Sequence, residues 1–113
     1  MMSTTRNRLH KTLRALAEPR RLAILEVLRA GEMRAGDIAG HFTLTRPAIS
    51  QHLRALADAK LISERREGTS RFYRIRREGF EDLRGFVDGF WRDRLASLKF
   101  AVEEEAVRRR RGR

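Results

Sequence analysis

LTRPAISQHLRAL, residues 44–56, is the stretch on which the predicted fold depends. Thr45 fits a helix N-cap, because its hydroxyl can accept a hydrogen bond from a free backbone N–H one turn into the helix. Pro47 then falls in the first turn, where the missing N–H of proline costs nothing. An apolar stripe follows at i, i+4 and i+7, formed by Ile49, Leu53 and Leu56. The stretch predicts an amphipathic helix over residues 45–58 whose opposite face carries small, amide and guanidinium groups.

Two helices are predicted near the N-terminus. The first contains residues 12–17 and starts as early as Thr5, and Glu18-Pro19 ends it because the residue before a proline disfavours helical geometry. The second runs from Pro19 to about Arg29, where Ala30-Gly31 stops it. Its expected buried side consists of Leu22, Leu25, Val27 and Leu28, with Ile24 near the edge.

A third short helix is predicted over residues 35–42, with Ile38 and Ala39 directed inward and Met33 in a short extended piece before it. Thr43-Leu44 forms the turn that leads into the helix at 45–58. Helix, short turn, helix is the order that a helix-turn-helix requires.

A β-hairpin is predicted after this pair of helices. Residues 61–66 and 70–76 have the composition of strands, and Gly68 in the Glu67-Gly68-Thr69 tip supplies the backbone angle that a tight turn needs. Tyr73 and Ile75 alternate toward one face. We expect a basic wing over residues 61–76.

A long last helix is predicted from about residues 78–81 to Val107, followed by a basic flexible tail over residues 108–113. Apolar residues recur along it every three to four positions: Phe80, Leu83, Val87, Trp91, Leu95, Leu98 and Val102, with Phe86, Phe90 and Phe100 widening the surface. Aromatic residues here either pack in a core or dimer interface or line a ligand pocket, and we favour packing. Residues 1–107 form one predicted domain.

Composition limits the possible functions. The 113 residues suit one domain, and the net charge of +11, of which +6 remains without the arginines at 108–111 and 113, favours nucleic acid as the partner. The absence of cysteine excludes disulfides, thiolate metal sites and thiol catalysis. Neither an apolar run of about 20 residues nor a signal-peptide core is present, so we expect a cytoplasmic protein without membrane contact.

Polar groups on the predicted helix and wing suit double-stranded DNA. A helix fits the major groove, where base edges are told apart by hydrogen bonding. Arg46 is expected to reach a guanine or a phosphate, Thr45 a phosphate, and Ala48 to allow close approach or contact a thymine methyl. Wing residues are expected to contact mainly phosphates. The full predicted DNA-binding set is Thr45, Arg46, Ala48, Ser50, Gln51, Arg54, Arg65, Arg66, Thr69, Ser70 and Arg71.

Several segments, in this order, resemble the ArsR-type winged-helix repressors over residues 9–105. They are LAEPRRLAIL at 16–25, TRPAISQHL at 45–53, Leu61-Ile62, and the hairpin to Tyr73 and Ile75. The resemblance implies a mainly α winged helix-turn-helix in the order α-α-α-α-β-β-α, which represses by blocking a promoter. It also implies a homodimer through the first and last helices, with an interface made by Leu9, Leu13, Leu16, Phe86, Phe90, Trp91, Leu95 and Leu98.

The sequence departs from the metal-sensing branch of that family. Where that branch carries paired cysteines, this chain has EMRAGDI at 32–38, and no histidine follows His52. His10, His41 and His52 are also far apart in sequence. We therefore predict no metal site and no cofactor, and the resemblance does not imply a particular effector.

Three other classes of function remain as alternatives. An architectural DNA or RNA binder would show little preference between sequences. A small enzyme would need a metal cluster, a phosphate-binding loop or a nucleophile with its base, and the sequence shows none of these, so no catalytic residue is predicted. A protein-interaction adaptor using the last helix would leave the basic wing unexplained.

Overall fold

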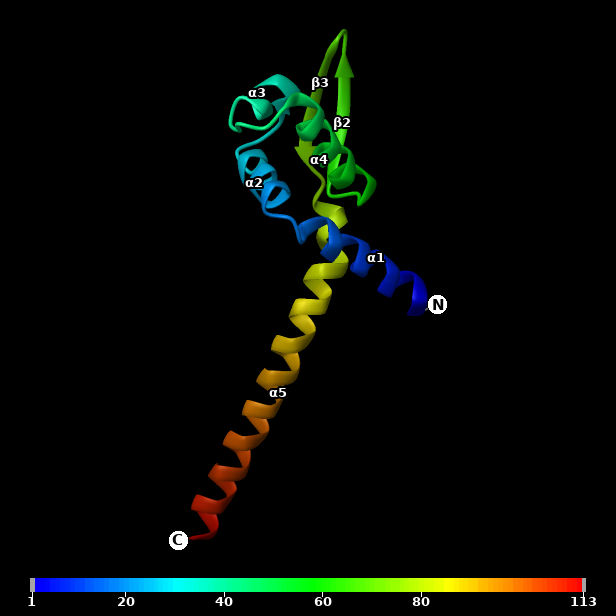
Figure 1. The fold of residues 1–113 in the computed structure, drawn as a ribbon. Coiled ribbons are helices and arrows are strands. Elements are labelled where there is room, and N and C mark those ends of the chain that lie inside the picture. The colour runs from blue at the N-terminus through cyan, green and yellow to red at the C-terminus, as the bar shows by residue number, and fades with distance from the viewer. Residues whose placement is uncertain (1, 113) are drawn as a thin grey trace. The chain divides into compact units, whose positions relative to one another are not determined.

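The computed structural model describes residues 2–112, with side chains from Thr4 onward, and the chain divides into two units, residues 1–83 and residues 84–113. The first unit contains α1 (Met2–Leu16), α2 (Pro19–Leu28), β1 (Met33–Arg34), α3 (Ala35–Ala39), α4 (Arg46–Asp58), β2 (Ile62–Glu67), β3 (Ser70–Ile75) and the 3-10 helix η1 (Arg77–Phe80). Helix α5 (Glu81–Arg111) begins there and makes up the second unit (Figure 1). The predicted mainly helical winged helix-turn-helix architecture is confirmed, and β1 adds a third strand to the predicted hairpin.

The boundary between α1 and α2 depends on Glu18. Its carboxylate accepts a hydrogen bond from the backbone N–H of Arg21 at 3.0 Å, which caps α2, and Pro19 occupies the first turn. The predicted break at Glu18-Pro19 is therefore confirmed.

The core of the first unit lies where α2, α3, α4 and the sheet meet. Its fully buried side chains are Ile24, Leu28, Ile38, Leu56, Leu61 and Ile62. The predicted buried side of α2 was partly wrong, because Leu22 is 47% exposed and Ile24 is completely buried. The segment carries apolar residues on several sides, so helical spacing alone did not show which of them the neighbouring elements would cover.

Helices α3 and α4 form the predicted helix-turn-helix. Helix α3 ends at Ala39 rather than Phe42. After it, the backbone N–H groups of His41 and Phe42 donate hydrogen bonds to the carbonyl groups of Ile38 and Ala39, three residues earlier, and form turns. Helix α4 begins as expected, since the Thr45 hydroxyl accepts from the backbone N–H of Ala48 at 3.3 Å. The stripe on α4 is buried as predicted.

The wing is an antiparallel sheet with strand order β1-β3-β2. Glu64 pairs with Tyr73 and Arg66 with Arg71, so these four residues share the face that carries buried Tyr73. Arg34 and Arg65 both pair with Phe72 and lie on the opposite face. Figure 1 shows β2 and β3 rising beside α3 and α4, with the hairpin tip projecting beyond them.

A close backbone contact joins the end of α4 to the segment after the wing. Lys60 ends the turn after α4 with φ 64°, and Gly79 in η1 lies against its carbonyl group. A Cβ at position 79 would overlap the Lys60 carbonyl oxygen, so glycine is required there by space.

Helix α5 is longer than predicted. It extends to Arg111, four residues past the predicted end at Val107, so the described arginines of the expected tail are helical. Basic residues in the last turn favour this, because the C-terminal end of a helix carries partial negative charge. No described helix is long and apolar enough to cross a membrane.

Candidate nucleic-acid interface

The outward face of α4 carries polar side chains above the buried apolar stripe. Arg46, Ser50, Gln51 and Arg54 are exposed, as is the capping residue Thr45, and Ala48 is half-buried. Because the stripe fixes the rotation of the helix against the core, these groups project away from it. The structure therefore presents the predicted α4 residues on an accessible surface.

The face of the wing that carries Tyr73 lies next to α4. A groove of about 110 Å³ is lined by Arg46 and Ser50 of α4, by Arg71 and Tyr73 of β3, and by residues of α3. Arg46 and Arg71 are far apart in sequence, and only the fold brings them to one groove.

One carboxylate shares this face with the wing arginines. Glu64 contacts Arg66 with 3.2 Å between Oε1 and Nε, and Arg71 with 3.7 Å between the same oxygen and Nε. All three side chains are at least about one-third exposed. Exposed ion pairs of this kind are weak, so a phosphate can replace Glu64 as the partner of either arginine.

Arg65 lies on the other face and has different surroundings. Its Nη2 is 2.7 Å from Oε1 of Glu32, and its Nη1 is 2.8 Å from Oε2 of Glu67. The guanidinium carbon also lies 4.5 Å from the centre of the Phe72 ring. The hydrogen bonds to Glu32 and Glu67 raise the pKa of Arg65. The hydrogen bond between Arg65 and Glu32 also lowers the pKa of Glu32.

The tip of the wing carries the remaining predicted residues. Thr69 is exposed beside Gly68, whose φ is 61°, and Ser70 is half-buried and pairs with Glu67. Their hydroxyl groups are small donors suited to a phosphate oxygen.

Sequence reasoning missed several residues of this region. Glu32 and Arg34 lie outside the predicted wing, and Glu64 lies within it but was not singled out. Glu32 and Glu64 nevertheless contact the wing arginines, and Arg34 lies 5.4 Å from the Phe72 ring centre. Glu32 and Arg65 are 33 positions apart, so no local pattern could have paired them. The alternation of the strands could have separated Arg65 from Arg66 and Arg71.

A second contact holds α4 against the start of α2. His52 Nδ1 lies 3.8 Å from Oε2 of Glu18, the residue that caps α2. Burial raises the pKa of Glu18, but the Arg21 backbone hydrogen bond and the charges of His52 and Arg20 lower it by more, so the net shift is downward. His52 therefore faces the protein rather than the outer surface of α4.

The predicted dimer-interface residues leave apolar surface uncovered in each unit. In the first unit Leu13 is 40% exposed, Leu9 is half-buried and Leu16 packs against the core. In the second unit the exposed members are Phe86, Phe90, Trp91, Leu95 and Leu98. Phe86 and Phe90 contact each other edge to face, with ring centres 5.0 Å apart.

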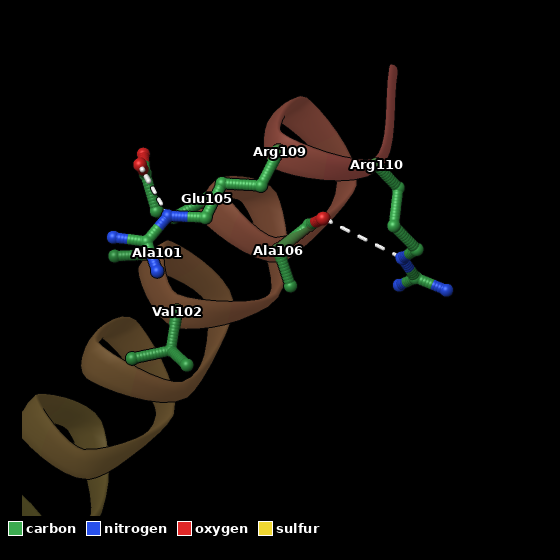
Figure 2. Close-up of a pocket in the computed structure, with 6 residues that line it drawn as sticks. All are labelled: Ala101, Val102, Glu105, Ala106, Arg109 and Arg110. Carbon is green, nitrogen blue, oxygen red and sulfur yellow. Dashed lines mark hydrogen bonds and ion pairs between the residues drawn. The ribbon is translucent and has the colours of Figure 1, made fainter. Parts of the chain in front are cut away.

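A hollow near the end of α5 does not resemble a ligand site. It is lined by Ala101, Val102, Glu105, Ala106, Arg109 and Arg110, all from this one helix (Figure 2). Arg109 pairs with Glu105 at 3.4 Å, and the Arg110 Nε donates to the Ala106 carbonyl group. A single helix supplies one wall only, so this part of the chain does not enclose a ligand. Among the described residues, no group of three potential metal ligands comes together.

A capped helix with an exposed polar face, following a short helix and a turn and flanked by a basic hairpin, defines the winged helix-turn-helix class of DNA-binding proteins. Residues 18–64 match the family model for bacterial regulatory proteins of the ArsR family. The chain belongs to the ArsR family of transcriptional regulators.

Curated relatives and solved structures agree with this assignment. The chain is 36% identical to the HTH-type transcriptional regulator Rv2034 of Mycobacterium tuberculosis, over 92% of this chain and 96% of the relative. It is 38% identical to the transcriptional repressor SdpR of Bacillus subtilis, over 66% and 82% of the two chains. The solution structure of the homodimeric winged helix-turn-helix domain Mb0332 of Mycobacterium bovis has a TM-score of 0.66 and 32% identity, covering 83% of this chain and 87% of that one.

Proposed function

We propose that this chain is a homodimeric repressor that binds an inverted-repeat DNA operator and blocks access of the polymerase. The observation that supports the proposal is the groove between α4 and the wing, whose lining includes the exposed residues Arg46 and Ser50 of α4 and Arg71 of β3. No enzymatic activity, metal or cofactor enters the proposal.

Helix α4 supplies the contacts to base edges. Gln51 and Arg54 carry groups able to make bidentate hydrogen bonds in the major groove, and half-buried Ala48 lets the helix backbone approach. Thr45 and Arg46 stand at the helix N-terminus, whose partial positive charge favours a phosphate.

The wing supplies contacts to the DNA backbone. Arg66 and Arg71 lie on the face toward α4, and Thr69 and Ser70 are at the tip. Such contacts give affinity and register but little direct sequence information.

Dimerisation would bury the apolar surfaces of α1 and α5. The row of exposed large side chains on α5 is costly in water for a monomer, and the similar Mb0332 domain is a homodimer. Two copies would present their α4 helices about 34–36 Å apart, which is one turn of DNA and favours an inverted repeat.

Selection of bound fragments from the source genome, followed by footprinting and competition with random duplex, tests the proposal. We expect a symmetric motif with half-sites one helical turn apart. Binding that random duplex competes away equally well would instead support an architectural nucleic-acid binder. A protein that binds neither genomic fragments nor random duplex would instead support a protein-interaction adaptor that uses α5.

A further inference from the structure

The side of the wing sheet that faces away from α4 carries a set of interlocked side chains, which we call the wing clamp: Glu32, Arg65, Glu67 and Phe72. Arg65 and Phe72 are paired across β2 and β3, and Glu32 precedes β1 on the far side of β3. None of these side chains lines the groove shared with α4.

The clamp is organised around the Arg65 guanidinium. Its Nε and Nη2 donate to the two carboxylate oxygens of Glu32 at 3.4 and 2.7 Å, and Nη1 donates to Glu67 at 2.8 Å. The Arg65 guanidinium group also lies over the Phe72 ring. The guanidinium carbon of Arg34 lies 5.4 Å from the centre of the same ring. Five fixed donors and a flat stacking surface are properties of arginine that lysine lacks.

The position of Glu32 explains what the clamp does. β1 has only two residues, it pairs with β3 alone, and α3 follows it directly. Strands β2 and β1 share no backbone hydrogen bonds, because β3 lies between them. The Glu32–Arg65 pair therefore spans the sheet and ties its outer strand to the segment that leads into the helix-turn-helix.

The geometry points to Arg65 and Glu32 as positioning residues that set the orientation of the wing relative to α4, rather than as DNA ligands. Arg65 lies on the face away from α4, and each of its three nitrogens already donates to Glu32 or Glu67, whereas Arg66 and Arg71 lie on the face toward α4. This inference rests on the proposed DNA-binding function, because the orientation of the wing matters for affinity only if the wing contacts the duplex.

If the clamp positions the wing, removing the charge of Glu32 should change the DNA affinity in the direction opposite to that expected from net charge. Removing a negative charge normally strengthens binding to a polyanion. Glu32→Gln should instead weaken binding, because it releases the wing. Glu64→Gln is the matched control, since Glu64 is 32% exposed against 34% for Glu32, lies in β2 next to Arg65, and contacts Arg66 and Arg71 on the other face.

The experiment measures operator affinity for the full-length wild type, Glu32→Gln, Glu64→Gln, Arg65→Lys and Arg29→Lys at one salt concentration. We expect Glu32→Gln and Arg65→Lys to lower the affinity about two- to fivefold, the range that exposed bridges of this kind support. Glu64→Gln should raise the affinity. Arg29→Lys makes the same change of side chain outside the wing and should stay near wild type, because Arg29 follows α2, pairs with Glu26 and lies outside the proposed DNA contacts.

Amide hydrogen exchange on the free proteins gives a second readout that needs no DNA. The amides of residues 65–71 should exchange faster in Glu32→Gln and Arg65→Lys than in wild type and Arg29→Lys, while the amides of α2 and α4 keep their protection. This pattern separates a released wing from a general loss of stability.

Two results would overturn the inference. One is an affinity gain in Glu32→Gln matching that of Glu64→Gln, together with wild-type affinity in Arg65→Lys, which would make Arg65 an ordinary phosphate contact. The other is unchanged hairpin exchange in both clamp variants. If wild type binds no DNA, the proposed function fails, and the exchange measurement still decides whether the clamp holds the wing.

Discussion

Thr45 and Glu18 show how much a single side chain decides in this fold. Each caps a helix through an oxygen that accepts a backbone N–H three residues later. Thr45 thereby sets the start of α4 and, with it, which residues stand in the first turn. Glu18 sets the start of α2 and also contacts His52 on the inner side of α4.

The outer residues of α4 are expected to separate specific from non-specific binding. Gln51→Ala or Arg54→Ala should cost roughly 1–3 kcal/mol on the operator, the value of one good bidentate base contact, and much less on random duplex. Competition binding with the two DNAs measures the difference.

Arg29→Ala is the matched control for Arg54→Ala. Arg29 is also exposed, follows α2, and pairs with Glu26 rather than standing on α4. Arg29→Ala removes the same charge as Arg54→Ala and should leave the ratio of operator affinity to random-duplex affinity unchanged. Equal losses on both DNAs for Arg54→Ala would assign Arg54 to the backbone instead.

At the scale of the elements, the contact of η1 with the residue after α4 leaves no space for a side chain at position 79. Gly79→Ala should destabilise the first unit by about 1–3 kcal/mol, typical of overpacking, because the Lys60 carbonyl group is backbone and cannot move alone. Thermal unfolding followed by circular dichroism measures this.

Gly85→Ala supplies the opposite expectation within α5. Nothing lies within 4 Å of a Cβ built at that position, so alanine should gain about 0.5–1 kcal/mol through its higher helix propensity. If both substitutions changed the unfolding temperature alike, space at position 79 would not be the reason for its glycine.

For the molecule as a whole, acid should destabilise the fold through three carboxylates. Hydrogen bonds from Arg8 and Arg65 lower the pKa values of Asp82 and Glu32, and the pKa of Glu18 is also lowered. A folded-state pKa below the ordinary 3.8 for Asp or 4.5 for Glu adds stability above those values, and this stability is lost as the pH falls through the folded pKa.

Chemical denaturation between pH 7 and pH 3 tests this pH dependence. The free energy of unfolding should stay level near neutrality and fall below about pH 4.5, within the range where carboxylates titrate. Asp82→Asn removes one of the three groups and should make that fall shallower. Stability that rises toward pH 3 would contradict the downward shifts.

The assembly is expected to depend on the apolar surface of α5. Sedimentation at micromolar concentration should show a dimer, and Leu95→Asp should weaken the dimer by about tenfold or more, equivalent to about 1.4 kcal/mol, because it places an unpaired charge in the interface. Ala96→Asp adds the same charge one position away, outside the Trp91, Leu95 and Leu98 row. A stable wild-type monomer would remove the paired-helix arrangement.

Local chemistry by itself determined the break before α2, the cap and buried stripe of α4, the glycine at the hairpin tip and the order of the elements. Each depends on residues within about two turns of one another, so helical or strand spacing records them. The mainly α winged helix-turn-helix class could be predicted for the same reason.

Only the tertiary structure decided which face of α2 is buried, why position 79 must be glycine, and which wing arginines lie beside α4. These features pair groups that are distant in sequence, such as Glu32 with Arg65 and Arg46 with Arg71. A run of arginines looks uniform in sequence. The two-residue repeat of a strand directs neighbours to opposite faces, and packing against α4 then gives each face a different environment.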